Sequence, residues 1–241
     1  MNRFIAYAYK QQYKPGIIGL FINPFYYART NLYHHVRKYS HYIRGRVLDV
    51  GCGNKPYEDI IDCEEYVGLE IDTEKNRMSK KADFFYDGGA FPFKDIDFDS
   101  IMISQVLEHI FEPELFLSEI SRVLKPCGTL LLTVPFVWDE HDQPFDYARY
   151  SSFGVKYLLE KHGFSILHQD KLGDDAGMIF QLVNAYIYKL ITTKNKYIKH
   201  LLMTLFCFPV NCIGVLMSKI LPKNKDLYLD NLIIAQKGQK L

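Results

Sequence analysis

The chain has 241 residues, enough for one large α/β domain with appendages, and its 48% hydrophobic content supports a full core. The formal net charge of +1 gives no indication of a polyanionic partner. The five cysteines are odd in number and lack the spacing of a metal site, so they predict reduced thiols in a cytoplasmic protein. No continuous apolar run near the start indicates a signal peptide.

Charge is distributed unevenly along the chain. Residues 1–48 hold eight Lys or Arg and no acid, and residues 176–225 hold seven Lys and no acid. All 28 acidic residues therefore lie in the remainder, against 14 basic ones. This asymmetry fits two interpretations: basic appendages that meet an anionic surface, or appendages that pack on an acidic core.

The chain order predicts an α/β core behind an N-terminal extension. Residues 1–44 form a basic, aromatic extension of helices and loops, and the core covers 45–175. Because strands and helices alternate in the core, we expect parallel βαβ units. The expected strands lie near 46–50, 65–70, 82–86, 98–103, 128–134 and 164–170, and the expected helices near 56–62, 112–123 and 152–162.

A helical insertion, 176–225, precedes the last segment, 226–241, which holds one more strand and the tail. Residues 201–218 are 18 residues without a charge, the length of a candidate membrane span. The chain must return to the same sheet, however, and Pro209 and Asn211 interrupt the run. A helical hairpin lying in a membrane interface fits better, with lysines at its ends. The alternative is a helix pair buried against the core or in a dimer.

A glycine turn after the first core strand carries most of the functional information. The apolar run that ends in Asp49 breaks into Gly51 and Gly53, and the next strand ends in Glu70. In an α/β sheet, such a turn beside an acid at the tip of the neighbouring strand is typical of a nucleoside site. Pro56 stands where a dinucleotide fingerprint has its third glycine, which argues against a nicotinamide-dependent oxidoreductase.

Later segments make the pattern specific. They are Asp87 with Ala90-Phe91-Pro92-Phe93, then Phe98-Asp99-Ser100, Gln105-Val106-Leu107-Glu108-His109, and Arg122-Val123-Leu124-Lys125-Pro126-Cys127-Gly128. In this order and spacing, the chain resembles the class I S-adenosylmethionine-dependent methyltransferases, in particular the broad type 11 group. The resemblance covers about 46–170. It implies a Rossmann-like, mostly parallel seven-stranded sheet whose last strand is antiparallel, and S-adenosylmethionine as cofactor.

The resemblance also implies roles for individual residues around that cofactor. The glycine loop with Asp49, Gly51 and Gly53 would enclose the methionine part of the cofactor. Glu70 would hold the ribose hydroxyls, and Asp87 with Gly88 would hold the adenine amino group. Ser104 and Gln105, at the end of the fourth strand, would flank the methyl donor. Lys55 replaces a glycine that is usual in the family.

Several of these residues have simpler interpretations. The glycines would also suit a tight turn without a ligand, Asp72 could replace Glu70, and Asp87 could cap its own turn. Glu108 and His109 follow the fourth strand, where a catalytic pair would lie; they equally suit a helix-start acid and a packed histidine.

The segment after the fifth strand concentrates polar, titratable and aromatic residues where α/β proteins form ligand sites. His141 is the candidate general base, since histidine ordinarily titrates at about 6.5. Glu140, Asp142 or Asp146 could orient this base or bind hydroxyls of the acceptor. Trp138 and Tyr147 could stack on a sugar ring, and Arg149 could pair with a phosphate. An ordered loop of mutually satisfied charges is the alternative. A metal at Glu108, His109 or His141 is conceivable, but the spacing gives it no positive support.

This loop and the segment 40–45 also resemble methyltransferases of bacterial surface-polysaccharide loci. We therefore expect O-methylation of a cell-surface glycan or lipid-linked saccharide by a cytoplasmic enzyme peripheral to the inner face of an anionic membrane. The alternatives are a methyltransferase of a small lipid or quinone precursor and a non-catalytic protein that binds S-adenosylmethionine. Nucleic acid is not expected as a partner, because the basic stretches carry no recognition motif.

Overall fold

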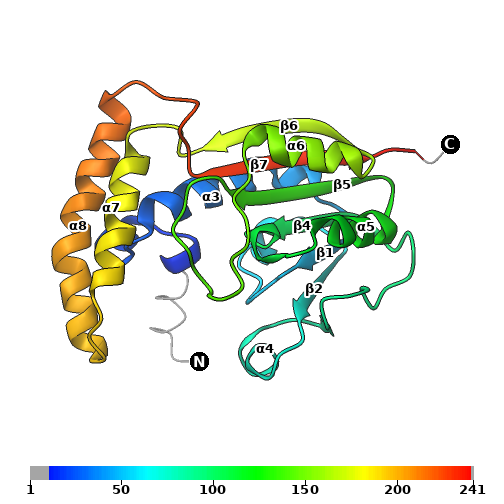
Figure 1. The fold of residues 1–241 in the computed structure, drawn as a ribbon, viewed down its shortest axis with the longest axis horizontal. Coiled ribbons are helices and arrows are strands. Elements are labelled where there is room, and N and C mark those ends of the chain that lie inside the picture. The colour runs from blue at the N-terminus through cyan, green and yellow to red at the C-terminus, as the bar shows by residue number, and fades with distance from the viewer. Residues whose placement is uncertain (1–10, 240–241) are drawn as a thin grey trace. The chain divides into compact units, whose positions relative to one another are not determined.

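The computed structural model describes residues 11–239 and contains a seven-stranded mixed sheet (Figure 1). The strand order is β3-β2-β1-β4-β5-β7-β6. The pairs among the first five strands in this order are parallel, and β7 is antiparallel to β5. The predicted fold class, an α/β Rossmann-like sheet with an antiparallel last strand, is confirmed.

The sheet and its helices have the following bounds. The strands are β1 (Arg46–Val50), β2 (Glu65–Ile71), β3 (Phe84–Tyr86), β4 (Phe98–Ser104), β5 (Leu124–Pro135), β6 (Phe164–Leu172) and β7 (Asp230–Lys237). The α-helices are α2 (Ile17–Ile22), α3 (Tyr26–Tyr39), α4 (Glu74–Ser79), α5 (Pro113–Val123), α6 (Ser152–Lys161), α7 (Gly177–Leu190) and α8 (Lys196–Ile220). Short 3₁₀ turns cover Ser40–Tyr42, Glu58–Ile60 and Leu107–His109.

The chain divides into two compact units. The core unit comprises Val36–Phe136, Glu140–Asp170 and Asp230–Leu241, and the appendage unit comprises Met1–His35, Val137–Asp139 and Lys171–Leu229. In the core unit, four of the five residues of β1 are buried, as expected for a central parallel strand covered on both faces. Helix α5 contributes Phe116, Leu117, Ile120 and Val123 to the same hydrophobic cluster.

Two local predictions were wrong and one element was missed. The helix expected over 56–62 is only the 3₁₀ turn Glu58–Ile60, because this segment has no apolar face long enough to stabilise an α-helix. Strand β5 begins at Leu124, four residues before the expected start. Helix α4 was missed because it is short and has no buried residue; Thr73 caps it by accepting a hydrogen bond from the backbone N–H of Asn76 (3.1 Å).

The appendage unit contains a helical hairpin, α7 and α8, whose helices lie side by side (Figure 1). Asn184 of α7 donates to the side-chain oxygen of Asn211 in α8 (2.8 Å), and Asn211 donates to the carbonyls of Leu20 and Asn23 (3.0 Å each). These polar side chains therefore stabilise a packed interior of the unit. Pro209 lies within α8, and the helix continues past it.

Candidate active site

The glycine turn follows β1 at the carboxyl edge of the sheet, where the strand order reverses between β1 and β4. Gly51 has φ +70°, and a Cβ on it would approach a methyl carbon of Val106 to 2.3 Å. Glycine is thus required for the contact between the ends of the two strands. Gly53 has φ +53°, and the nearest atom to a Cβ built on it is the Lys80 ammonium at 3.8 Å. Space is therefore open beside Gly53.

Glu70 lies near the end of β2 and faces this turn. Its Oε2 accepts a hydrogen bond from the backbone N–H of Gly53 (3.0 Å), and Oε1 accepts one from Ile71 (3.3 Å). An ionised carboxylate has about four acceptor positions, so capacity remains for two ribose hydroxyls. Asp72, the alternative acid, is paired with Arg77 through two contacts of 2.5 and 2.6 Å. The geometry therefore favours Glu70 over Asp72 as the ribose ligand.

Asp49 and Asp87, two further acids expected around the cofactor, lie in different environments. Asp49 is buried and accepts a hydrogen bond from the Tyr66 hydroxyl (2.7 Å); burial raises the pKa of its carboxyl to about 7. Asp87 is exposed and accepts a hydrogen bond from the backbone N–H of Gly89 (3.0 Å), next to Gly88 with φ +96°.

The end of β4 is held by one residue of β5. The hydroxyl of Ser104 lies 3.0 Å from that of Thr133, and the backbone N–H of Gln105 donates to the Thr133 carbonyl (3.0 Å). Lys55 does not point a cation at the open space, because its ammonium pairs with Asp83 (2.6 Å) and is largely buried. An acid with spare acceptor capacity, an open glycine turn and a fixed β4 end together fit a bound adenosyl group.

A second group of residues lies beyond the ends of β4 and β5. Glu108, His109 and His141 place ligand-capable atoms within 4.8 Å of one another. The Glu108 side chain is fully buried, and neither carboxylate oxygen has a hydrogen-bond partner. Burial raises the pKa of this carboxyl to about 8; the nearby Asp230 acts in the same direction.

The loop after β5 folds over this group. The backbone N–H groups of Tyr147 and Ala148 donate to the Glu108 carbonyl (2.9 and 3.2 Å). Asp146 accepts two hydrogen bonds from the Arg149 guanidinium (2.6 and 2.7 Å) and one from the backbone N–H of His141 (2.9 Å). Arg149 thus neutralises Asp146 and holds the Asp146 pKa at about 2.

The remaining predicted acceptor residues are less closely grouped. Glu140 is exposed and accepts a hydrogen bond from Gln143 (3.2 Å), and Asp142 adopts φ +48°. Tyr147 is exposed, with its ring packed edge-on against Phe111. Trp138 belongs to the appendage unit, where its ring lies 5.8 Å from that of Phe25.

Asp230 and Asn231 were missed by the sequence analysis. Both are buried at the start of β7, and Pro135, which ends β5, pairs with Asp230. An antiparallel last strand brings its first residues to the carboxyl edge of its parallel neighbours, so the expected topology already contained the signal.

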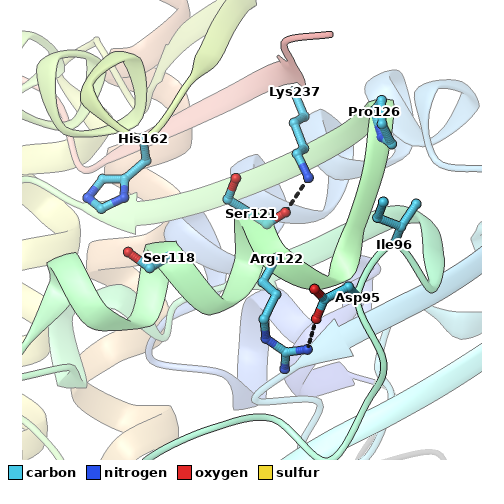
Figure 2. A pocket seen from close by; sticks show the side chains of 8 residues that line it. All are labelled: Asp95, Ile96, Ser118, Ser121, Arg122, Pro126, His162 and Lys237. Carbon is cyan, nitrogen blue, oxygen red and sulfur yellow. Dashed lines mark hydrogen bonds and ion pairs between the residues drawn. The ribbon is translucent and has the colours of Figure 1, made fainter. Parts of the chain in front are cut away.

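A cavity of about 310 Å³ lies beside the amino-terminal end of β4 (Figure 2). Its lining includes Asp95 and Ile96, which precede β4, and Arg122 and Pro126, which flank the start of β5. Arg122 is paired with Asp95 (2.8 Å), and Lys237 donates to the Ser121 carbonyl. This cavity is therefore separate from the glycine turn.

Comparisons with known proteins agree with this geometry. Residues 48–132 match the family model described as a methyltransferase domain. A protein of Mycolicibacterium smegmatis named "Probable S-adenosylmethionine-dependent methyltransferase" is 28% identical over 57% of this chain and 58% of its own. A demethylmenaquinone methyltransferase of Renibacterium salmoninarum is 35% identical over 36% of this chain and 40% of its own. The chain thus spans about half the length of the curated relatives it matches.

The fold extends the likeness beyond the matched segment. A crystal structure of a SAM-dependent methyltransferase from Archaeoglobus fulgidus superposes with a TM-score of 0.54 at 16% identity, covering 96% of this chain and 99% of the other. The fold is therefore the Rossmann-like architecture that class I methyltransferases share. More particularly, residues 48–132 and the curated relatives that the chain matches in part are similar to S-adenosylmethionine-dependent methyltransferases.

Proposed function

We propose that the protein methylates an oxygen atom of a cell-surface glycan or lipid-linked saccharide. One observation carries the proposal: Glu70 faces the glycine turn at the edge of the sheet where Glu108, His109 and His141 also gather. S-adenosylmethionine supplies an electrophilic methyl group when bound. Glu70, Gly51 and Gly53 would hold this cofactor, with Asp87 toward the adenine and Ser104 and Gln105 beside the methyl donor.

The acceptor would be bound and deprotonated by the loop after β5. His141 is the candidate general base because its Nδ1 lies 3.2 Å from Asp146, whose charge fixes the ring's orientation. Glu140, Asp142 and Tyr147 supply polar and aromatic groups for acceptor hydroxyls and a sugar ring. Arg149 would contribute indirectly, because it holds the Asp146 carboxylate that orients the His141 ring.

The appendage unit supports a membrane-associated acceptor. Of the described helices, one, Tyr197–Ile220, is long and apolar enough to cross a membrane by length and composition, and only 22% of its most apolar window is buried. Its large exposed side chains include Leu201, Leu205 and Leu216. Lys194 and Lys219, near its two ends, are also exposed. We infer that this face lies on an anionic lipid surface, which would place the enzyme at the cytoplasmic side of the membrane.

Label transfer tests the acceptor class. The purified protein is incubated with S-adenosylmethionine carrying a tritiated methyl group and with detergent extracts of membranes from the producing cell. We expect label in the lipid-linked saccharide fraction, and none with the Glu70→Ala variant. Mass spectrometry of glycans from a gene deletion gives the second readout; an unchanged glycan profile would contradict the proposal.

The second candidate function is methylation of a small lipid such as a quinone precursor. The likeness to a demethylmenaquinone methyltransferase favours it, and the same apolar face would serve it. Label in the quinone fraction would identify this alternative. A non-catalytic role would instead leave the biological phenotype intact in a His141→Ala variant and abolish it in Glu70→Ala.

A further inference from the structure

The three side chains Glu108, His109 and His141 form a compact group of metal-ligand type. The Nε2 atom of His109 lies 3.9 Å from Glu108 Oε1, and the two imidazole rings meet edge to face with centroids 4.8 Å apart. All three candidate ligand atoms lie within 4.8 Å of one another. One ion at their centre would therefore need only small side-chain movements to reach bonds of about 2.0–2.2 Å.

Glu108 is the observation that points to a bound cation. Its carboxylate is fully buried, and neither oxygen has a hydrogen-bond partner. A buried polar group without a hydrogen-bond partner is destabilising, and more so when it is charged. Proteins therefore pair such carboxylates or use them to coordinate metals. Asp230 and Asp146 add negative charge nearby and Arg149 opposes it.

The surroundings of His109 fix which ring nitrogen faces the group. Its Nδ1 lies 2.7 Å from the backbone carbonyl of Phe145. A carbonyl oxygen can only accept, so Nδ1 carries the proton in the neutral ring. The lone pair is then on Nε2, the atom directed at Glu108, and a metal requires this form.

His141 is oriented in a related way by a carboxylate. Its Nδ1 lies 3.2 Å from Asp146 Oδ2, and the Arg149 guanidinium donates to both oxygens of the same carboxylate, which therefore acts as an acceptor toward the ring. Nδ1 is thus the donor, and Nε2 becomes the ligand atom. Metal-binding histidines almost always donate their other ring N–H to a carboxylate or a backbone carbonyl. His141 has a carboxylate partner in Asp146, and His109 has a backbone carbonyl partner in Phe145.

We propose that Glu108, His109 and His141 bind one divalent transition-metal ion of the manganese-to-zinc series, with open positions for an acceptor oxygen. Two imidazoles and one carboxylate suit these ions and disfavour Mg²⁺. The catalytic consequence rests on the proposed function: the ion would bind the acceptor hydroxyl and favour loss of its proton to solvent. His141 would then be a ligand, and the metal would replace it as the agent of deprotonation.

Metal binding is measured directly on the tag-free full chain, without cofactor or acceptor. Calorimetry with Zn²⁺ and the visible absorption of added Co²⁺ both report the site. We expect roughly one equivalent per chain in the wild type and at least about tenfold weaker binding in Glu108→Gln and His141→Gln. Asp146→Asn, which acts through His141, should weaken binding by about 10–100-fold. His200→Gln, an exposed histidine of α8, is the matched control.

Two outcomes would overturn the metal site: no saturable binding in the wild type, or equal binding by Glu108→Gln with an unchanged circular dichroism spectrum. Glu70→Ala separates this inference from the proposed function. It should lose S-adenosylmethionine and keep Zn²⁺ and Co²⁺. If the wild type binds metal but not S-adenosylmethionine, the proposed function fails and the metal site stands.

Discussion

At the scale of single residues, the proposed binding of S-adenosylmethionine depends on which acid accepts hydrogen bonds from the ribose hydroxyls. The Glu70 carboxylate accepts a hydrogen bond from Gly53 in the glycine turn, whereas Asp72 forms an ion pair with the exposed Arg77. We expect Glu70→Ala to weaken S-adenosylmethionine binding by about 100-fold, because two hydrogen bonds to a charged group are worth about 3 kcal/mol together. Calorimetric titration measures the change.

The matched control for this prediction is Asp72→Ala, two residues along the chain. Its carboxylate is not directed at the turn, so the affinity should stay within about threefold of the wild type. A larger loss in Asp72→Ala than in Glu70→Ala would reverse the assignment.

Asp49 makes a separate prediction about pH. Burial raises the pKa of its carboxyl from 3.8 to about 7, with Glu70 and Glu58 adding to the shift and the Tyr66 hydroxyl and Lys55 opposing it. Between these two values the folded chain holds a proton at Asp49 that the unfolded chain has lost. The contribution of Asp49 to stability is therefore greatest below about pH 4 and falls as pH rises to about 7, by at most about 4 kcal/mol.

Asp49→Asn removes this titration while keeping an oxygen for the Tyr66 hydroxyl. Urea unfolding of both proteins between about pH 5 and 8 isolates the effect, since all other groups are shared. The variant should gain stability over the wild type as pH rises. A constant difference across this range would show that Asp49 does not titrate there.

At the scale of elements, the glycine turn joins β1 to the end of β4. Gly51→Ala would set a methyl group 2.3 Å from Val106 and force alanine to φ +70°. We expect a loss of about 2–4 kcal/mol in the free energy of unfolding, from overpacking and left-handed backbone strain together. Chemical denaturation measures this loss.

Gly163→Ala controls for the strain alone, because Gly163 has φ +81° and nothing lies within 4 Å of its added Cβ. It should cost about 1–2 kcal/mol. Adding Val106→Ala to Gly51→Ala should recover the overpacking part. If both glycine variants cost the same, the contact with Val106 is not what requires glycine.

The strands and the cofactor-site residues could be predicted from the sequence where neighbouring residues along the chain determine their positions. The buried run of β1, the two glycines and Glu70 belong to two consecutive, parallel strands and the turn between them, so their meeting follows from the parallel topology. The partners of Asp146 and His109 come from loop geometry that no periodicity encodes. Trp138 was grouped with the acceptor residues because it is adjacent in sequence, yet it packs in the appendage unit.

At the scale of the whole molecule, the uneven charge has a structural counterpart. The two stretches without acids, 1–48 and 176–225, supply most of the appendage unit. Asn211, which argued against a membrane span, donates to two carbonyls of the N-terminal segment, and Gln181 donates to the carbonyl of Pro24 (3.0 Å). These polar side chains are therefore hydrogen-bonded inside the unit. The residues exposed on α8 between Leu201 and Leu216 are apolar, and exposed lysines lie near both ends of the helix.

This arrangement predicts lipid binding through one face of α8. Leu201 and Leu205 are 67% and 60% exposed and lie one turn apart, so Leu201→Glu with Leu205→Glu changes a single patch without opening the interior. Each leucine contributes about 1.5 kcal/mol on insertion, and the double variant should bind anionic vesicles roughly 100-fold more weakly in flotation. Phe153→Glu, 81% exposed on α6 of the core unit, is the matched control and should float like the wild type.

Salt and lipid charge separate the two contributions to that binding. Neutral vesicles or high salt should weaken flotation of the wild type by removing the attraction of the lysines, each worth about 1 kcal/mol near an anionic surface. The leucine variant should lose binding under every condition, because its apolar contribution is gone. Equal flotation of the wild type and the leucine variant would show that α8 does not meet the lipid, and the exposed face would then be an interface for protein.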